Sequence, residues 1–597
     1  MRIKWFSFVR VTGLFLVLFY HFFKQAFPGG FIGVDVFFTF SGYLITALLI
    51  DEHARHKTID LLGFLKRRFY RIVPPLVIMV LVTLPFTLLI RKDFVADIGH
   101  QVASVIGFTT NLYEILTGSS YESQFIPHLF VHTWSLAIEV HFYLFWGILI
   151  WLLSRKIKQP KQFRGIIFLI SLGLFFTSFL TMFIRAFFVS NFSVIYFSTL
   201  SHIYPFFLGA IFATISGISE TTGRFKKNVM LWDTRRVIIY IALSAALLLL
   251  LGFILDFNSI ITYLFGFVLA SLFTAVMVYS SRVLNDKTPN IKEPVLITYL
   301  ADTSYGVYLF HWPLYIIFGQ LMPNWLAVVF TLLFSFIFAS LSYYVLEPYI
   351  AGKQPAFLGL EINLNAYKKW LYACLGVLAA IVFGILATAP KVGNFETSLL
   401  VDSLNQAENS LNRTHTLAAG DASAISDITV IGDSVALRSS SAFSELLPEA
   451  QVDAAVSRNF ENAYEIYQNH ITNNSLSKTV IIAVGVNSLE DYKNKIKQFV
   501  DALPKGHRLI FVTPYNAKDD RIPSVRDYEL ELAKQYNYVT VADWYETAVS
   551  HPDIWAGSDG VHYSDSSNSE GANLYVDTIK KAIARSAKNP AKGEAAE

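Results

Sequence analysis

The chain has 597 residues, of which 54% are hydrophobic and only 16% are charged. Soluble domains usually carry about 25% charged residues, so this composition excludes a wholly soluble protein. The net charge of +3 says little about partners, and we expect no nucleic acid among them. The apolar excess ends near residue 388. We therefore predict a membrane domain over 1–388, a polar linker or stalk over 389–425, and a soluble domain over 426–597.

Apolar segments of about 20 residues, the length that crosses a bilayer, recur along the membrane domain. A weaker apolar stretch at 98–112 is interpreted as re-entrant or interfacial. The single cysteine, Cys374, lies in an apolar run and excludes a disulfide within the chain. We expect eleven membrane-spanning helices, near 7–23, 33–50, 73–90, 133–153, 165–188, 203–217, 237–253, 259–279, 299–317, 325–346 and 369–388.

The loops between these helices alternate in charge. Lys and Arg gather in every second loop, as in HARHKTIDLLGFLKRRFYR at 53–71, whereas the loops between them carry almost none. Basic loops face the cytoplasm. The pattern therefore predicts a cytoplasmic N-terminus, and eleven crossings place the C-terminal domain outside the cytoplasm.

Ionisable side chains inside the predicted spans are costly at bilayer depth, which makes them candidates for function. We interpret Arg10, His21 and Glu139 as functional. For Asp35, His202 and Glu347, which lie near helix ends, buried polar pairing is the more ordinary explanation. The remaining ionisable residues in the spans are His141 and His311.

The C-terminal part has a different pattern. Short β-branched runs bounded by turn residues alternate with stretches of helical spacing, such as 489–503 and 526–536. This alternation predicts an α/β/α domain with a parallel sheet, whose sites lie at the carboxyl ends of the strands. The runs are DITVIGDS (427–434), KTVIIAVGVNS (478–488), HRLIFVTPYN (507–516) and YVTVADWYE (538–546).

Three signals fall at such strand ends. Ser434 follows the first run, Gly485 and Asn487 follow a central one, and Asp559 precedes His562 by three residues in SDGVHY. A serine becomes a nucleophile when a base takes its proton. His562 is the predicted base, oriented by Asp559. The Ser434 N–H and the loop of Gly485 and Asn487 are the predicted oxyanion hole.

Two further histidines of this part, His507 and His551, lack an Asp three residues before them, and we interpret them as surface residues. No metal is expected, because the histidines are scattered and lack ligand spacing. A sugar-stacking or acyl-shielding rim is one interpretation of several aromatic residues, and ordinary packing is the other. These residues are Tyr515, Trp544, Tyr545, Trp555 and Tyr563.

The membrane part resembles the acyltransferase-3 family of integral membrane acyltransferases. The resemblance rests on Arg10 and His21 and on a series of motifs in the order of the family. It implies acyl transfer from a cytoplasmic thioester, with His21 as base, Glu139 as its partner, and Arg68 and Arg71 on the phosphates of coenzyme A. The motifs are GGFIGVDVFFTFSGYLI (29–45), RRFYRIVPP (67–75), HTWSLAIEVHFYL (132–144), SYGVYLFHWPL (304–314) and YYVLEPY (343–349).

The C-terminal part resembles the SGNH (GDSL-like) hydrolases and esterases, through IGDSV, VGVNS and SDGVH. The glycine expected in the second block of that family is absent, and Ser457 and Arg458 lie near its place. Together the two parts resemble the peptidoglycan O-acetyltransferase A type of Gram-positive bacteria.

That resemblance implies a relay across the lipid bilayer. Acetyl from cytoplasmic acetyl-CoA, with no bound cofactor, is carried outward to Ser434 and then to the C6 hydroxyl of N-acetylmuramic acid in peptidoglycan, which confers resistance to lysozyme. Three alternatives stay open: an esterase that removes O-acetyl groups, a transporter or polysaccharide exporter with an idle outer domain, and acylation of another surface glycan such as teichoic acid.

Overall fold

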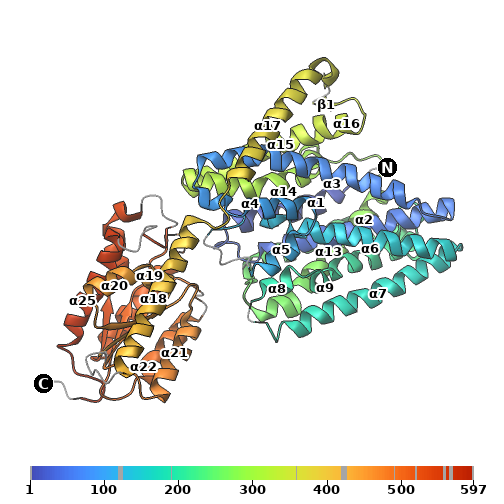
Figure 1. Cartoon of the computed structure of the whole chain (residues 1–597). Coiled ribbons are helices and arrows are strands. Elements are labelled where there is room, and N and C mark those ends of the chain that lie inside the picture. The colour runs from blue at the N-terminus through green and yellow to red at the C-terminus, as the bar shows by residue number, and fades with distance from the viewer. Residues whose placement is uncertain are drawn as a thin grey trace. The chain divides into compact units, whose positions relative to one another are not determined.

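The structure is a computed structural model. It describes all residues except 1–2, 119–125, 190, 358–359, 419–426, 488, 490, 518, 520, 556–559, 564–568 and 595–597. The chain divides into two compact units, Met1–Lys391 and Val392–Glu597. The first is helical and the second contains a parallel sheet between helices (Figure 1).

Every predicted span of the first unit coincides with a helix. Within the described residues, nine helices are long and apolar enough to cross a membrane; α1, with 17 residues, and α14 are not among these nine. The helices at the predicted spans are α1 (Phe6–Phe22), α2 (Gly33–His56), α3 (Leu61–Thr83), α6 (Trp134–Lys156), α7 (Pro160–Arg185), α10 (Tyr204–Ser216), α12 (Thr234–Ile254), α13 (Phe267–Lys287), α14 (Val295–Leu321), α15 (Asn324–Ser340) and α17 (Lys368–Thr388).

Shorter elements complete this unit. The stretch that we interpreted as re-entrant or interfacial forms two short helices, α4 and α5. The short elements are α4 (Ile98–Ile106), α5 (Thr110–Leu116), α8 (Ser193–Tyr196), α9 (Thr199–His202), α11 (Gly223–Leu231), α16 (Glu347–Ile350), β1 (Ala356–Phe357) and β2 (Leu360–Glu361).

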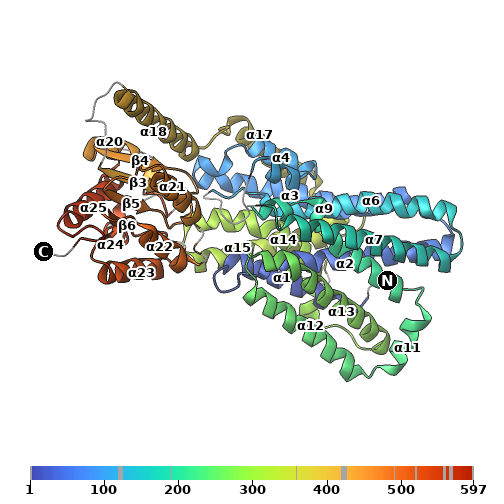
Figure 2. The same cartoon turned by 90° about the horizontal axis from the view of Figure 1, so that it is seen from below.

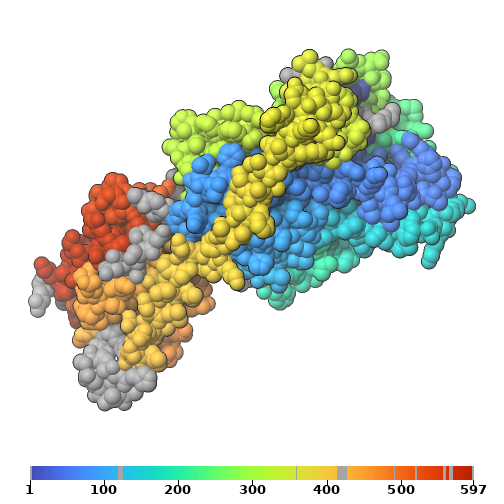
Figure 3. Space-filling view, turned by 45° about the horizontal axis from the view of Figure 1, so that its top comes forward, coloured from blue at the N-terminus to red at the C-terminus, as the bar shows by residue number. Residues whose placement is uncertain are grey.

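Small residues let α2 and α10 pack against each other. A Cβ added at Gly42 would lie 2.0 Å from the carbonyl oxygen of Phe206, and one added at Gly209 would lie 2.0 Å from that of Thr39. Close backbone approach through glycine is common where helices pack in membranes. By contrast, α17 exposes most of its apolar side chains, and its yellow atoms lie on the surface in Figure 3. Such a surface suits contact with lipid.

The second unit has five parallel strands in the order β4-β3-β5-β6-β7. The sheet lies between α20 and α25 on one side and α21 and α22 on the other (Figure 2). This architecture confirms the predicted α/β/α fold. Its elements are β3 (Ile428–Gly432), α19 (Ser434–Arg438), α20 (Ser440–Leu446), β4 (Ala450–Ala454), α21 (Phe460–Thr472), β5 (Thr479–Ala483), α22 (Tyr492–Ala502), β6 (Arg508–Val512), α23 (Ile522–Gln535), β7 (Val539–Ala542), α24 (Trp544–Ser550) and α25 (Glu570–Ser586).

Two elements of this unit differ from the sequence analysis. The edge strand β4 was not among the predicted strands, because AQVDA has a single β-branched residue and is only half-buried. A helix, α18 (Asn394–Ala418), lies where a polar linker was expected. It packs on α19, α20 and β4, so the second unit begins at Val392 and includes this helix.

Candidate active site

Ser434 is held at the carboxyl end of a central strand. It follows β3 and is the first residue of α19, and the preceding Asp433 caps that helix by accepting the Val435 N–H at 3.0 Å. The turn between strand and helix is tight. A Cβ added at Gly432 would lie 2.3 Å from the Cβ of Ala436, which explains the glycine at this position.

The predicted nucleophile and base are in contact. Ser434 Oγ and His562 Nε2 lie 2.8 Å apart, although 128 residues separate them in the chain. Both side chains are buried, with exposed fractions of 0% and 1%. The geometry suits transfer of the hydroxyl proton to the imidazole. The third predicted member, Asp559, lies outside the described residues.

Asp433 links the turn at Ser434 to the segment that follows β5, the neighbouring strand in the sheet. Its carboxylate accepts N–H groups of Val435, Gly485 and Val486. Burial raises the pKa of Asp433 from 3.8 to about 6, and the three amides and the nearby His562 limit that rise. The N–H of Gly485 therefore serves Asp433 in this conformation, a role different from the predicted oxyanion donor.

The other predicted oxyanion residue, Asn487, follows β5, the neighbour of β3 in the sheet. Its side-chain amide donates to the carbonyl oxygen of Arg458 at 3.4 Å. Arg458 in turn holds the ends of β3 and β4, donating to the carbonyl oxygen of Gly432 at 3.2 Å and to the Asp453 carboxylate at 2.7 Å. Arg458, near the second-block position, is thus a structural arginine.

Ser457, just before this arginine, has a left-handed backbone with φ of 58°. This conformation favours glycine, the residue expected in the second block from the SGNH resemblance, so Ser457 occupies the glycine position and Arg458 follows it.

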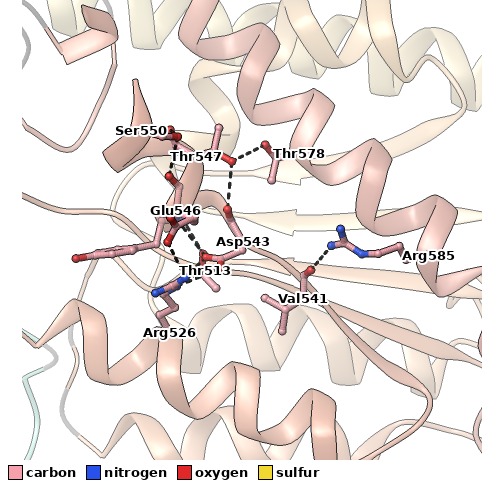
Figure 4. Close-up of polar contacts among 10 residues, drawn as sticks. Thr513, Arg526, Val541, Asp543, Glu546, Thr547, Ser550, Thr578 and Arg585 are labelled. Carbon is pink, nitrogen blue, oxygen red and sulfur yellow. Dashed lines mark hydrogen bonds and ion pairs between the residues drawn. The ribbon is translucent and has the colours of Figure 1, made fainter. Parts of the chain in front are cut away.

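A separate polar cluster occupies the end of β7 (Figure 4). Asp543 accepts three hydrogen bonds from Arg526, the shortest at 2.7 Å, and one from Thr513 at 3.0 Å. This pairing accounts for the low pKa of Asp543, which burial opposes. The same region anchors α25 to the sheet, because Arg585 donates to the carbonyl oxygen of Val541 at 2.7 Å. Asp543 thus joins the end of β7 to α23 and to the end of β6.

The aromatic residues considered for a rim divide into two groups. Trp544 and Tyr563 are buried, with 1% exposed, and belong to the core. Tyr515, Tyr545 and Trp555 are half-buried, and the ring of Tyr515 packs against both others, with its centroid 4.4 Å from that of Trp555 and 5.8 Å from that of Tyr545. The rim interpretation is therefore restricted to these three residues.

In the first unit, four of the predicted residues line one cavity of about 110 Å³: Arg10, Arg68, Arg71 and Glu139. Within it, Glu139 accepts a hydrogen bond from Ser41 at 2.8 Å and another from Tyr143, one helical turn away. Sequence reasoning did not find these hydroxyl partners, although the spacing of four residues between Glu139 and Tyr143 was a signal.

A larger cavity of about 1410 Å³ adjoins this one and shares Arg10, Phe40, Leu44 and Arg68 with it. It is lined by the basic loop of 53–71 and has the size for a nucleotide-bearing thioester. The buried Nε of Arg68 has no hydrogen-bond partner among the described residues. An unpaired guanidinium N–H beside a cavity is a ready donor to an anionic ligand.

His21 lies apart from that cavity and pairs with a second histidine. His311 Nδ1 is 2.6 Å from the carbonyl oxygen of Tyr308, so it carries the proton, and His311 Nε2 is an acceptor. His21 Nδ1 lies 2.7 Å from that acceptor and is therefore the donor. The pair fixes the neutral tautomer of His21 with its lone pair on Nε2, the form a general base requires.

Comparisons with known proteins identify the family of the chain. The model of a family described as "Acyltransferase domain" matches residues 3–389. The chain belongs to this acyltransferase family. It is 27% identical to O-acetyltransferase OatA of Staphylococcus aureus (strain NCTC 8325 / PS 47) over 610 residues, covering 96% of this chain and 95% of the relative.

Two further matches have similar names. A putative O-acetyltransferase of Staphylococcus aureus (strain MRSA252) is 28% identical over 620 residues, with 96% of each chain covered. The solved C-terminal catalytic domain of Streptococcus pneumoniae peptidoglycan O-acetyltransferase A, carrying a methylsulfonyl adduct, is 43% identical. That match covers 28% of this chain and 99% of that domain, with a TM-score of 0.27.

The other ionisable residues of this acyltransferase have structural partners. Asp35 and His202 form a fully buried pair at 3.2 Å, and Glu347 accepts from Ser342 at 3.1 Å. In the second unit His507 and His551 are hydrogen-bonded to backbone carbonyl oxygens, those of Ser477 at 2.9 Å and Thr547 at 2.8 Å.

The sequence analysis missed the neighbours of the Ser434–His562 pair that come from α18. The ring of Phe395 lies 4.9 Å from the imidazole of His562, between ring centroids. Asp402 of α18 forms an ion pair at 3.1 Å with Arg438, which lies in α19 four residues after the nucleophile. The only signal in the sequence was the apolar spacing of Phe395 and Leu399 within a stretch read as polar.

Proposed function

We propose that this acyltransferase transfers acetyl from cytoplasmic acetyl-CoA, across the membrane, to the C6 hydroxyl of N-acetylmuramic acid in peptidoglycan. The observation that carries the proposal is the hydrogen-bonded Ser434–His562 pair in a chain whose other unit belongs to a membrane acyltransferase family. O-acetyltransferase relatives that match nearly the full length of the chain support the same reaction class.

In the proposed membrane step, acetyl-CoA enters the larger cavity at the cytoplasmic end of the first unit. Arg68 and Arg71 bind its phosphates, since guanidinium groups form paired hydrogen bonds with phosphate oxygens. His21 takes the proton of the acceptor hydroxyl as its oxygen attacks the acetyl carbonyl carbon, and the imidazolium then gives this proton to the departing coenzyme A thiolate. The tautomer of His21 that this requires is set by His311. Arg10 and Glu139 line the smaller cavity, through which the thioester end of the donor extends toward His21.

In the proposed outer step, Ser434 Oγ attacks the acetyl carbonyl carbon while His562 takes the hydroxyl proton. The imidazolium, oriented by Asp559, then gives this proton to the leaving group. The Ser434 N–H and the Asn487 amide stabilise the oxyanion. The sugar hydroxyl attacks the acetyl-serine next, His562 takes its proton, and Ser434 Oγ leaves and is reprotonated.

The division of labour follows from charge and size. Acetyl-CoA is charged and stays in the cytoplasm, whereas the polymeric acceptor stays outside. The alternating basic loops support a cytoplasmic N-terminus and an extracellular second unit. An O-acetylated wall would resist lysozyme-like muramidases.

The experiment uses the full chain in proteoliposomes, with labelled acetyl-CoA on the side of the N-terminus and muramoyl oligosaccharide on the other. We expect label in the sugar and, after acid quenching, one acetyl group on the peptide that contains Ser434. Ser434→Ala should lose both the labelled sugar and the acetylated peptide. The matched control is His551→Ala, which removes a histidine that bonds to a backbone carbonyl oxygen outside the site, and it should keep both. Labelled sugar in the Ser434→Ala variant would contradict the proposal, and labelled acetate without labelled sugar would favour an esterase.

A further inference from the structure

Helix α18 is attached to the sheet domain along one face. Gln406 exchanges two hydrogen bonds with the backbone of Ala454 at the end of β4, of 3.0 and 3.1 Å. Asn409 donates to Ser444 of α20 at 3.1 Å. The opposite side of the helix is exposed, for example at Leu404. The contacts recur every three or four residues, the period of one helix face.

The first turns of this helix are fixed to the nucleophile helix by a buried ion pair. Arg438 and Asp402 lie 3.1 Å apart with side chains 0% and 3% exposed, and Arg438 also donates to Ser398. Removing one partner of such a pair leaves a buried charge without its counterion, which is costly. The pair therefore fixes the position of α18 relative to Ser434, four residues before Arg438.

The same turns close over the base. The Phe395 ring contacts the His562 imidazole, and the Arg438 guanidinium lies 5.7 Å from the centre of the Phe395 ring. Phe395 and Leu399 are each only 6% exposed, on a helix whose outer side faces solvent. The polar pair at the centre of the site is thus bordered by an apolar side chain of α18.

We propose that Phe395, held by the Arg438–Asp402 pair, is a specificity-determining residue that forms an apolar wall of the acyl-enzyme and excludes water from it. The inference deepens the proposed function and rests on it. An acetyl group on Ser434 meets either water or a sugar hydroxyl, and His562 serves both as base. The two products differ only in which oxygen attacks the carbonyl carbon, so a wall that keeps water out favours transfer.

The test measures a ratio. The full chain in detergent receives para-nitrophenyl acetate as acetyl donor and muramoyl oligosaccharide as acceptor, and both acetate and acetylated sugar are quantified. In Phe395→Ala we expect the ratio of acetate to acetylated sugar to rise roughly tenfold. Phe395→Leu, which keeps an apolar side chain, should restore most of the wild-type ratio. The matched control is Leu404→Ala, on the exposed side of the same helix.

A second variant tests Phe395 indirectly, through the Arg438–Asp402 ion pair that positions it. Asp402→Asn removes the ion pair with little change of shape, and we expect the ratio to rise in the same direction as in Phe395→Ala. Because the ratio does not depend on the amount of folded enzyme, partial unfolding of a variant leaves the result readable. An unchanged ratio in both variants would overturn the wall, while loss of both products in Ser434→Ala would still uphold the proposed function.

Discussion

The two units bring their functional residues together in different ways. In the second unit, parallel pairing places Gly432 opposite both Ala454 and Ala483, so the segments after three strands begin at one level. Ser434 lies in one of those segments. In the first unit, Arg10 and His21 share one helix and are eleven residues apart, which separates them by roughly 16 Å along its axis. The functional residues of the second unit gather at the carboxyl ends of its strands, whereas those of the first unit are spread along the length of its helices.

In the second unit residues far apart in the sequence are in contact, whereas in the first unit residues close in the sequence lie in separate sites. His562 contacts Ser434 across 128 residues, because both lie at the same end of the sheet. Residues close in sequence, such as Arg10 and His21, belong to different environments: one lines a cavity beside Glu139, and the other pairs with His311. The proposed relay needs both arrangements, since its donor and its acceptor would be on opposite sides of a membrane.

The largest expected effect is a loss of transfer that depends on which acetyl donor is supplied, and it distinguishes the roles of the two units. His21→Ala should lower transfer from acetyl-CoA by on the order of 10³-fold, because a general base is lost. The same variant should keep transfer from para-nitrophenyl acetate, which loads Ser434 directly. Both rates are measured on one proteoliposome preparation. Equal loss with both donors would show that the units do not act in sequence.

The second prediction concerns how the stability of the second unit depends on the protonation of Asp433. Burial raises the pKa of Asp433 from 3.8 to about 6, so the folded unit binds this proton more tightly than the unfolded chain does. The stability that this proton contributes is fully present below pH 3.8 and is lost as the pH rises through about 6. A shift of about two pKa units corresponds to ~3 kcal/mol.

Asp433→Asn lacks this titration. The stability of the wild type relative to the variant should therefore fall by roughly 2.5 kcal/mol between pH 4 and pH 7. Hydrogen exchange in β3 and β5 of the full chain measures it. Asp577→Asn, at an exposed position of α25, is the matched control and should show no such change. A difference that stays constant with pH would contradict the prediction.

The third prediction tests the histidine pair of the first unit. His311→Leu removes the acceptor for the His21 Nδ1 proton, and we expect transfer from acetyl-CoA to fall by about 10²-fold. His311→Gln, whose side-chain oxygen accepts that proton, should recover much of the activity and keep a wild-type pH profile. If the Leu and Gln variants were equally impaired, the tautomer argument would fail and packing alone would explain the pair.

The smallest expected effect concerns donor binding. Arg68→Gln removes a charged donor from the phosphate site, and the KM for acetyl-CoA should rise about tenfold, with kcat little changed. Steady-state kinetics with the full chain in detergent measures both constants. Lys66→Gln, at an exposed position two residues earlier, should leave the KM unchanged. A fall in kcat without a change in KM would assign Arg68 to a later step.

Much of the fold followed from local patterns. Apolar length gave a helix at each predicted span, including 203–217, where α10 lies. β-branched runs located β3, β5, β6 and β7, because such residues favour half-buried extended chain. The edge strand β4 escaped, since an edge strand needs few apolar residues. Helix α18 was not predicted for a related reason: most of its anchoring contacts are polar, and its buried apolar residues, such as Phe395 and Leu399, lie on one face only.

The sequence by itself determined the two-part organisation and the chemical types: a serine after a strand, a histidine near the end of the chain, and ionisable residues within apolar helices. Only the tertiary structure decided which of them meet. It joined Ser434 to His562, gave His21 a partner in His311 rather than Glu139, and brought Phe395 of a presumed linker against the base. The physical reason is that composition and periodicity fix local conformation and burial, whereas sheet register and helix packing decide which distant side chains share one buried site.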